Sequence, residues 1–115
     1  MLCLGDSYTI GEGVLAVGRW PVQLAARLRA AGLTVTEPEL IARTGWTTEE
    51  LAAAIDAAAP QGPYELVTLL VGVNDQYRGR PLAETRPRFV ALLQRAVAFA
   101  GGDAGRVLVL SVPDW

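Results

Sequence analysis

The fold of this chain is decided by residues 2–11, which read LCLGDSYTIG. A short apolar run ends at Gly5, and small and polar residues follow it. An apolar run of this length that ends in glycine is typical of a buried β-strand. A serine just past the first strand of an α/β sheet lies at the carboxyl edge, where such sheets bind ligands. Ser7 is therefore the candidate functional residue, and the other motifs are examined for groups that could act together with it.

The next segments predict a helix and a second strand. Trp20-Pro21 opens the helix, because proline is well tolerated in a first turn, and Gly32 ends it as a C-terminal cap. Residues 33–42 predict the second strand, and Pro38 marks that strand as an edge or bulged strand.

The second half of the chain repeats this alternation. Residues 47–50, TTEE, have the spacing of a capping box and predict a helix over 48–59. The apolar run within residues 65–73 predicts a strand that is buried on both faces. The remaining segments are a polar loop or frayed turn over 76–86, a helix from about Pro87 to Ala100, a fourth strand over 106–112 and a turn at 113–115.

Strands that alternate with helices, without repeats or linkers, predict a single α/β domain over residues 1–115 with a parallel sheet. The composition agrees with one globular domain, since 51% of the residues are hydrophobic and 19% are charged. Cys3 is the sole cysteine, which excludes an intramolecular disulfide, and its apolar neighbours predict a buried, unreactive thiol.

Several function classes are disfavoured by charge and hydropathy. The 10 basic residues, all arginine, do not form a basic stripe, and with 12 acidic residues the net charge is −2. We therefore expect no nucleic-acid partner. No apolar run reaches the roughly 18 residues that a membrane span requires. The compartment is not fixed by the sequence. Because no signal peptide is visible, a cytoplasmic location is favoured.

Three polar turns follow three of the predicted strands. They lie at residues 5–7, 44–45 and 72–75. Because the carboxyl ends of parallel strands meet at one edge of the sheet, the three turns are expected to lie near one another.

These turns carry the groups that serine ester hydrolysis needs, apart from a base. Ser7 is the candidate nucleophile. The backbone N–H groups of Ser7 and Gly45 and the side-chain amide of Asn74 are candidate oxyanion donors, and Gly45 lets the backbone approach a substrate because it has no Cβ. Asp6 and Asp75 are expected to stabilise their turns through backbone hydrogen bonds rather than to act as acids.

Together the three turns resemble the motif blocks of the SGNH, or GDSL-type, hydrolase family of esterases and acylhydrolases. The blocks are GDSY at 5–8, with Tyr8 in place of the leucine of the family name, TGWTT at 44–48 and GVND at 72–75. The resemblance implies a flavodoxin-like three-layer sandwich with sheet order 2-1-3-4-5 and a Ser-His-Asp site. It also implies a small-molecule ester substrate, and neither a metal nor an organic cofactor.

The chain departs from this family pattern after the fourth predicted strand. The family takes its catalytic Asp and His from an Asp-x-x-His block that follows a fifth strand, whereas this chain ends at Trp115 and contains no histidine. We interpret residues 1–115 as an SGNH hydrolase-like domain truncated at its C-terminus, which carries the nucleophile and oxyanion hole but not the His/Asp pair.

Two other functions are compatible with parts of the pattern. One is a non-catalytic ligand-binding module with the same fold. The other is a nucleotide- or flavin-binding domain, which is disfavoured because GEG at 11–13 lacks the third glycine of a dinucleotide fingerprint and no P-loop lysine exists.

Aromatic and arginine side chains near the turns have two interpretations each. Trp20, Trp46 and Tyr77 either line an acyl pocket or pack against the fold, and packing is expected for at least two of them. Arg78 and Arg80 either bind an anionic substrate or belong to a solvated loop, which is the more ordinary arrangement.

Overall fold

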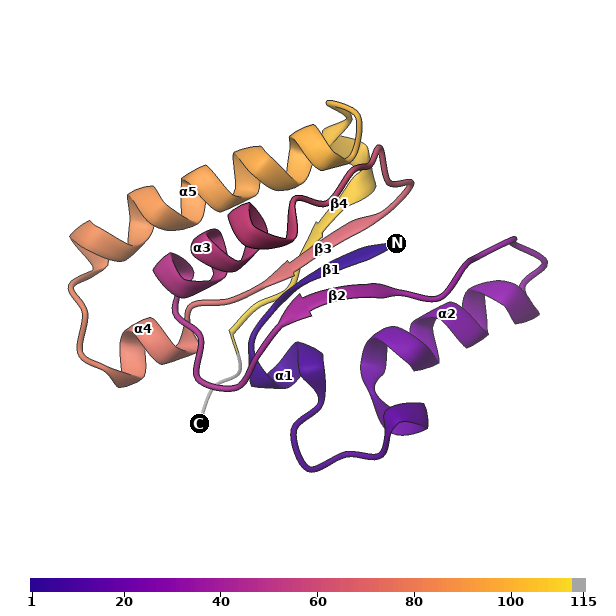
Figure 1. Cartoon of the computed structure of the whole chain (residues 1–115), viewed down its shortest axis with the longest axis horizontal. Helices are drawn as coiled ribbons and strands as arrows, with labels where there is room; N and C mark the ends of the chain where they lie inside the picture. Colours follow the sequence, from indigo (N-terminus) through magenta and orange to yellow (C-terminus); the bar gives the residue numbers. More distant parts are fainter. Residues whose placement is uncertain (113–115) are drawn as a thin grey trace.

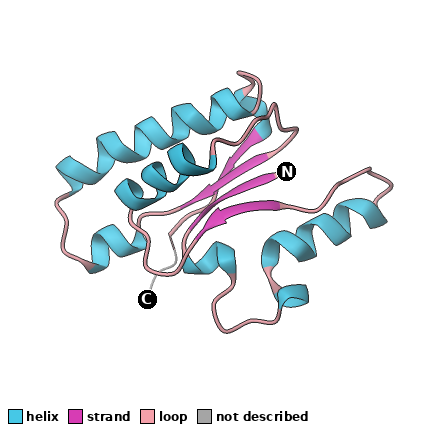
Figure 2. Ribbon diagram, viewed as in Figure 1, coloured by secondary structure: helices cyan, strands magenta, loops and turns pink. Residues whose placement is uncertain are grey.

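The computed structural model describes residues 1–112, so the turn predicted at 113–115 lies outside the described residues. The strands are β1 (Leu2–Gly5), β2 (Glu39–Ala42), β3 (Val67–Leu70) and β4 (Val107–Val109). The helices are α1 (Ser7–Ile10), α2 (Trp20–Ala30), α3 (Thr48–Ala58), α4 (Val73–Tyr77) and α5 (Leu82–Phe99), with short 3₁₀ helices η1 (Ala16–Gly18) and η2 (Ala104–Arg106) (Figure 2).

The four strands form one parallel sheet in the order β2-β1-β3-β4. The chain passes from β1 to one neighbour, β2, and then crosses to the other side of β1 to form β3, so the order reverses between β1 and β3. Helices α3 and α5 lie together on one side of the sheet, whereas α1 and α2 lie on the other (Figure 1). This arrangement confirms the predicted α/β, flavodoxin-like order over the four strands that the structure describes.

The main core lies between the sheet and the α3–α5 layer. Leu51 and Ile55 of α3 and Leu92 of α5 are fully or almost fully buried against residues of the central strands. Burial of each such side chain stabilises the fold by roughly 1.5–3 kcal/mol. Cys3 is also fully buried in β1, and burial raises the pKa of its thiol, as expected for an unreactive thiol.

The predicted helix ends are confirmed by specific backbone contacts. After α2, Gly32 takes a left-handed φ of 92°, its N–H bonds to the Arg29 carbonyl, and the Leu33 N–H bonds to the Leu28 carbonyl. This pair of bonds is a Schellman motif, which satisfies carbonyls at the helix end. At the start of α3, Thr47 and Glu50 form the predicted capping box.

The predicted second strand over 33–42 was too long. Only Glu39–Ala42 pairs with β1, and residues 33–38 lie outside any strand. Pro38 has no N–H to donate to a neighbouring strand, so pairing begins just after it, with the Glu39 N–H donating to the Met1 carbonyl. β2 is an edge strand, as Pro38 predicted.

The predicted loop over 76–86 was wrong at both ends. Helix α4 extends to Tyr77, and α5 begins at Leu82 rather than near Pro87. Pro81 fixes the entry to α5, since its carbonyl accepts hydrogen bonds from the N–H groups of Glu84 and Thr85. Pro87 is tolerated inside α5 although it removes one helical hydrogen bond.

β4 borders the sheet on the side opposite β2. Leu108 and Val109 are about half exposed there, so this edge presents apolar side chains. Within residues 1–112, no helix is both long enough and apolar enough to span a membrane.

Candidate active site

Ser7 is the first residue of α1, and only Asp6 separates it from the end of β1, an inner strand of the sheet. Gly5 allows close packing here, because a Cβ at this position would collide with Thr9 Oγ1 and lie 2.7 Å from the Leu70 carbonyl oxygen. Asp6 caps α1 by accepting a hydrogen bond from the Tyr8 N–H at 3.0 Å. The Ser7 N–H belongs to the first helical turn, where backbone N–H groups have no intrahelical acceptor. This turn thus presents both the hydroxyl and an N–H donor of Ser7.

Asn74 is the second residue of α4 and follows β3, the neighbour of β1. Gly72 makes this turn possible with a φ of 127°, which side chains disfavour. Ser7 and Asn74 line one depression of about 220 Å³, together with Tyr8, Val73 and Tyr77. The structure therefore brings the candidate nucleophile and one candidate oxyanion donor to the same surface hollow.

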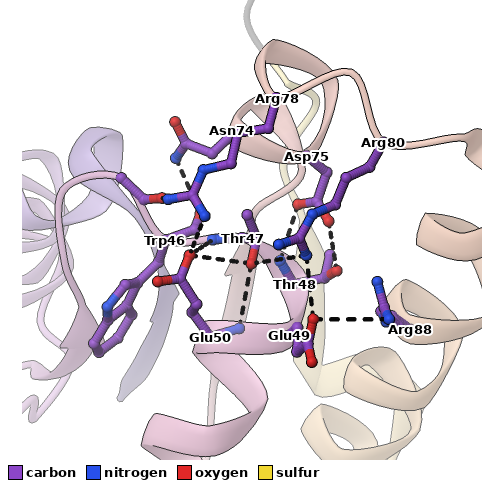
Figure 3. Close-up of polar contacts among 11 residues, drawn as sticks. Trp46, Thr47, Thr48, Glu49, Glu50, Asn74, Asp75, Arg78, Arg80 and Arg88 are labelled. Carbon is purple, nitrogen blue, oxygen red and sulfur yellow. Dashed lines mark hydrogen bonds and ion pairs between the residues drawn. The ribbon is translucent and has the colours of Figure 1, made fainter.

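Gly45 does not line this depression, but its loop is bonded to Asn74. We call residues 43–47 the Gly45 loop. The Asn74 amide Nδ2 donates to the Trp46 carbonyl at 2.9 Å (Figure 3). Because an amide nitrogen carries two N–H donors, this bond leaves a second N–H on Asn74. Gly45 itself has a φ of 85°, a conformation that favours glycine.

Asp75, the residue after Asn74, is 1% exposed. Its carboxylate accepts hydrogen bonds from the Thr48 N–H at 2.9 Å and from Thr48 Oγ1 at 2.7 Å (Figure 3). Asp75 therefore stabilises the first turn of α3 rather than the turn in which it lies. Asp6, by contrast, stabilises its own turn.

Asp6 is also 1% exposed, and its Oδ2 has no hydrogen-bond partner among the described residues. Burial raises the pKa of the Asp6 carboxyl above its ordinary value, and the negative charge of Asp75 acts in the same direction. The hydrogen bond from the Tyr8 N–H lowers the pKa but does not offset the burial.

Arg78 and Arg80 lie in or next to an exposed segment, since residues 76–79 are exposed, as expected for a solvated loop, but both also form ion pairs. Arg78 lies 3.0 Å from Glu50 Oε1, and Arg80 lies 3.3 Å from Glu49 Oε2. Both arginines therefore tie the segment after α4 to the first turn of α3. Sequence reasoning missed this role, and the available signal was charge complementarity between these arginines and the acidic start of the predicted helix.

The aromatic residues are divided between packing and the site. Trp46 packs against the hydrophobic core, and Trp20 lies in α2 away from the depression. Tyr77 lines the depression with Ser7. Within residues 1–112, no cluster of three or more acidic or cysteine side chains is placed to hold a metal ion.

Comparison with known proteins extends these observations. A family model described as "GDSL-like Lipase/Acylhydrolase family" matches residues 3–114, nearly the whole chain. The chain belongs to this GDSL-like family. A search of curated proteins found no match.

Solved structures related to this GDSL-like chain include two at 25% identity. TesA superposes with a TM-score of 0.81 and covers 96% of this chain. AlinE4, described as an SGNH-hydrolase family esterase, has a TM-score of 0.78 and covers 97%. The esterase EstA from Pseudoalteromonas sp. shares the fold, with a TM-score of 0.73 and 22% identity. The chain spans 59% of the length of TesA and of AlinE4.

Proposed function

We propose that the full-length protein is a serine hydrolase that cleaves small carboxylic esters through an acyl-enzyme on Ser7. By full-length protein we mean residues 1–115 together with a segment that we propose to follow them. The observation that carries this proposal is the depression shared by Ser7 and Asn74, at the reversal point of the sheet. Membership of the GDSL-like lipase/acylhydrolase family supports it.

In the proposed reaction, Ser7 Oγ attacks the carbonyl carbon of the ester while a base accepts the hydroxyl proton. The N–H groups of Ser7 and Gly45 and the free N–H of Asn74 Nδ2 stabilise the resulting oxyanion. Collapse of the intermediate breaks the bond to the alcohol, which leaves with the proton from the base. Water then attacks the acyl-enzyme by the same route and releases the acid and free Ser7.

The base is the group that residues 1–115 do not supply. The sequence contains neither histidine nor lysine, and carboxylates are far weaker bases near neutral pH. We propose that an Asp-x-x-His block after Trp115 provides it. Asp6 and Asp75 are assigned supporting roles, since each carboxylate holds a backbone turn in place.

The test uses the full-length protein with p-nitrophenyl acetate and an organophosphonate that labels active serines. We expect turnover and one phosphonyl adduct on the peptide containing Ser7. The Ser7→Ala variant should keep its circular dichroism spectrum, lose the adduct and lose turnover by a factor on the order of 10³ or more. Undiminished hydrolysis by folded Ser7→Ala protein would refute the assignment. Ester binding without turnover or labelling would favour the non-catalytic module.

A further inference from the structure

Two successive carbonyl groups of the Gly45 loop are bound by side chains from one segment. Arg78 Nη2 donates to the Gly45 carbonyl at 2.7 Å. Asn74 Nδ2 donates to the Trp46 carbonyl at 2.9 Å (Figure 3). The Arg78 N–H also bonds to the Asn74 carbonyl, as expected for residues four apart on a helical turn. Asn74 in α4 and Arg78 at its C-cap therefore project from one side of this helical segment onto the same loop.

The guanidinium of Arg78 makes a second contact that fixes its direction. Nη1 lies 3.0 Å from Glu50 Oε1 in the first turn of α3. A planar guanidinium holds two acceptors in a fixed geometry, which a lysine ammonium does not do. Arg78 thus joins the Gly45 carbonyl, in the middle of the Gly45 loop, to the first turn of α3.

Gly45 is the residue at which such a contact matters most. Glycine with a positive φ is the most freely rotating backbone position, and within the loop the turn around Gly45 is closed by a backbone bond from the Trp46 N–H to the Arg43 carbonyl at 3.3 Å. The Arg78 bond adds a side-chain anchor to the same peptide unit, since that unit joins the Gly45 carbonyl to the Trp46 N–H. The Arg78 side chain is 43% exposed, and exposed ion pairs contribute little to global stability. The contact therefore influences the direction of the Gly45 backbone more than it influences the stability of the fold.

We propose that Arg78 is a positioning residue, which anchors the turn around Gly45 so that the Gly45 N–H, in the preceding peptide unit, keeps the direction needed for oxyanion stabilisation. This inference rests on the proposed function, because Gly45 is a candidate donor there. Arg78 does not touch the ester, and it acts through the Gly45 carbonyl.

Arg88 provides a matched control on α5. Its side chain is 39% exposed and pairs with Glu49 of α3 at 3.7 Å. Arg88 thus resembles Arg78 in charge, exposure and the helix that it pairs with. Arg88 contacts the Glu49 side chain, which lies outside the Gly45 loop.

The experiment compares full-length wild type, Arg78→Ala, Arg78→Lys and Arg88→Ala. The first readout is kcat and KM for p-nitrophenyl acetate, and the second is backbone hydrogen exchange of a peptide spanning the Gly45 loop. We expect Arg78→Ala to lower kcat about 10- to 30-fold with KM within about twofold, since a misdirected donor costs less than a deleted one. Exchange in the loop should rise about tenfold. Arg78→Lys should recover part of both losses, and Arg88→Ala should match wild type.

The two readouts separate this inference from the proposed function. If wild type turns over and folded Arg78→Ala keeps its kcat, the inference is wrong while the proposed function stands. If wild type does not hydrolyse the ester, the proposed function fails, and backbone hydrogen exchange of the Gly45 loop alone tests the inference. Faster exchange in the Arg78 variants then supports the positioning contact, whereas unchanged exchange overturns it. Should Arg78→Ala not fold, Arg78→Lys carries both comparisons.

Discussion

Asp75 accepts two hydrogen bonds from Thr48, one from its N–H and one from its hydroxyl, across 27 residues of sequence. Both residues are buried. The pair joins α4, which carries Asn74, to the first turn of α3, which follows the Gly45 loop. The two candidate donor segments are therefore connected through a buried carboxylate as well as through surface contacts.

We expect Asp75→Ala to lower the free energy of unfolding by about 2–4 kcal/mol, because buried hydrogen bonds to a charged acceptor are among the stronger ones and the Thr48 donors would lose their partner. Urea denaturation of the full-length protein measures the change. Asp103→Ala removes an exposed carboxylate that caps η2 and should cost much less. The Thr48→Val substitution should cost less in the Asp75→Ala background than in wild type. Equal costs would show that the two residues are not energetically coupled.

Asn74→Ala should lower kcat about 10²- to 10³-fold with little change in KM, because the variant loses a proposed oxyanion donor. The same substitution also removes the hydrogen bond to the Trp46 carbonyl. Comparison with Arg78→Ala separates the two effects, since that variant loosens the loop and keeps the amide. A loss of kcat no larger than that of Arg78→Ala would assign Asn74 a purely positional role. A change confined to KM would place it in substrate binding.

The sequence predicted those features that depend on local chemistry. The capping box at Thr47, the glycine cap at Gly32 and the parallel strand pattern are set by residues a few positions apart. The limits of β2 were not predictable from its apolar pattern, because pairing with β1 begins only after Pro38.

The contacts of the candidate site were harder to predict, because they join distant segments. The hydrogen bond of Arg78 to Gly45 crosses 33 residues, and no spacing rule indicates it. The motif pattern predicted Ser7, Gly45 and Asn74 as site residues. The contacts between their segments depend on tertiary packing, so the motifs did not predict them. Short helices such as α1 and α4 were missed for the same reason, since a helix of one turn is stabilised mainly by its surroundings.

Asp6 predicts a pH dependence of stability. Since burial raises its pKa in the folded state, the folded chain binds this proton more tightly than the unfolded chain does. The free energy of unfolding of wild type should therefore fall relative to that of Asp6→Asn as the pH rises. The fall begins near pH 3.8, the ordinary pKa of Asp6, and continues through the raised pKa of the folded state. The Asn variant keeps an oxygen that can accept the Tyr8 N–H. Denaturation of both proteins between about pH 3 and pH 7 tests this, and a difference that does not vary with pH would contradict it.

The exposed edge of β4 and the absence of a suitable base predict how residues 1–115 behave when expressed alone. Leu108 and Val109 are about half exposed on a border strand, and apolar strand edges with unpaired backbone groups promote association. Without histidine or lysine, Ser7 has no side chain suited to accept its proton near neutral pH. We therefore expect the isolated chain to associate on size-exclusion chromatography and to leave short-chain esters uncleaved. A Leu108→Lys variant should be more monomeric and equally inactive, because it alters the edge and not the site. A monodisperse, cooperatively folding chain whose esterase activity is blocked by a serine-directed inhibitor would overturn this prediction.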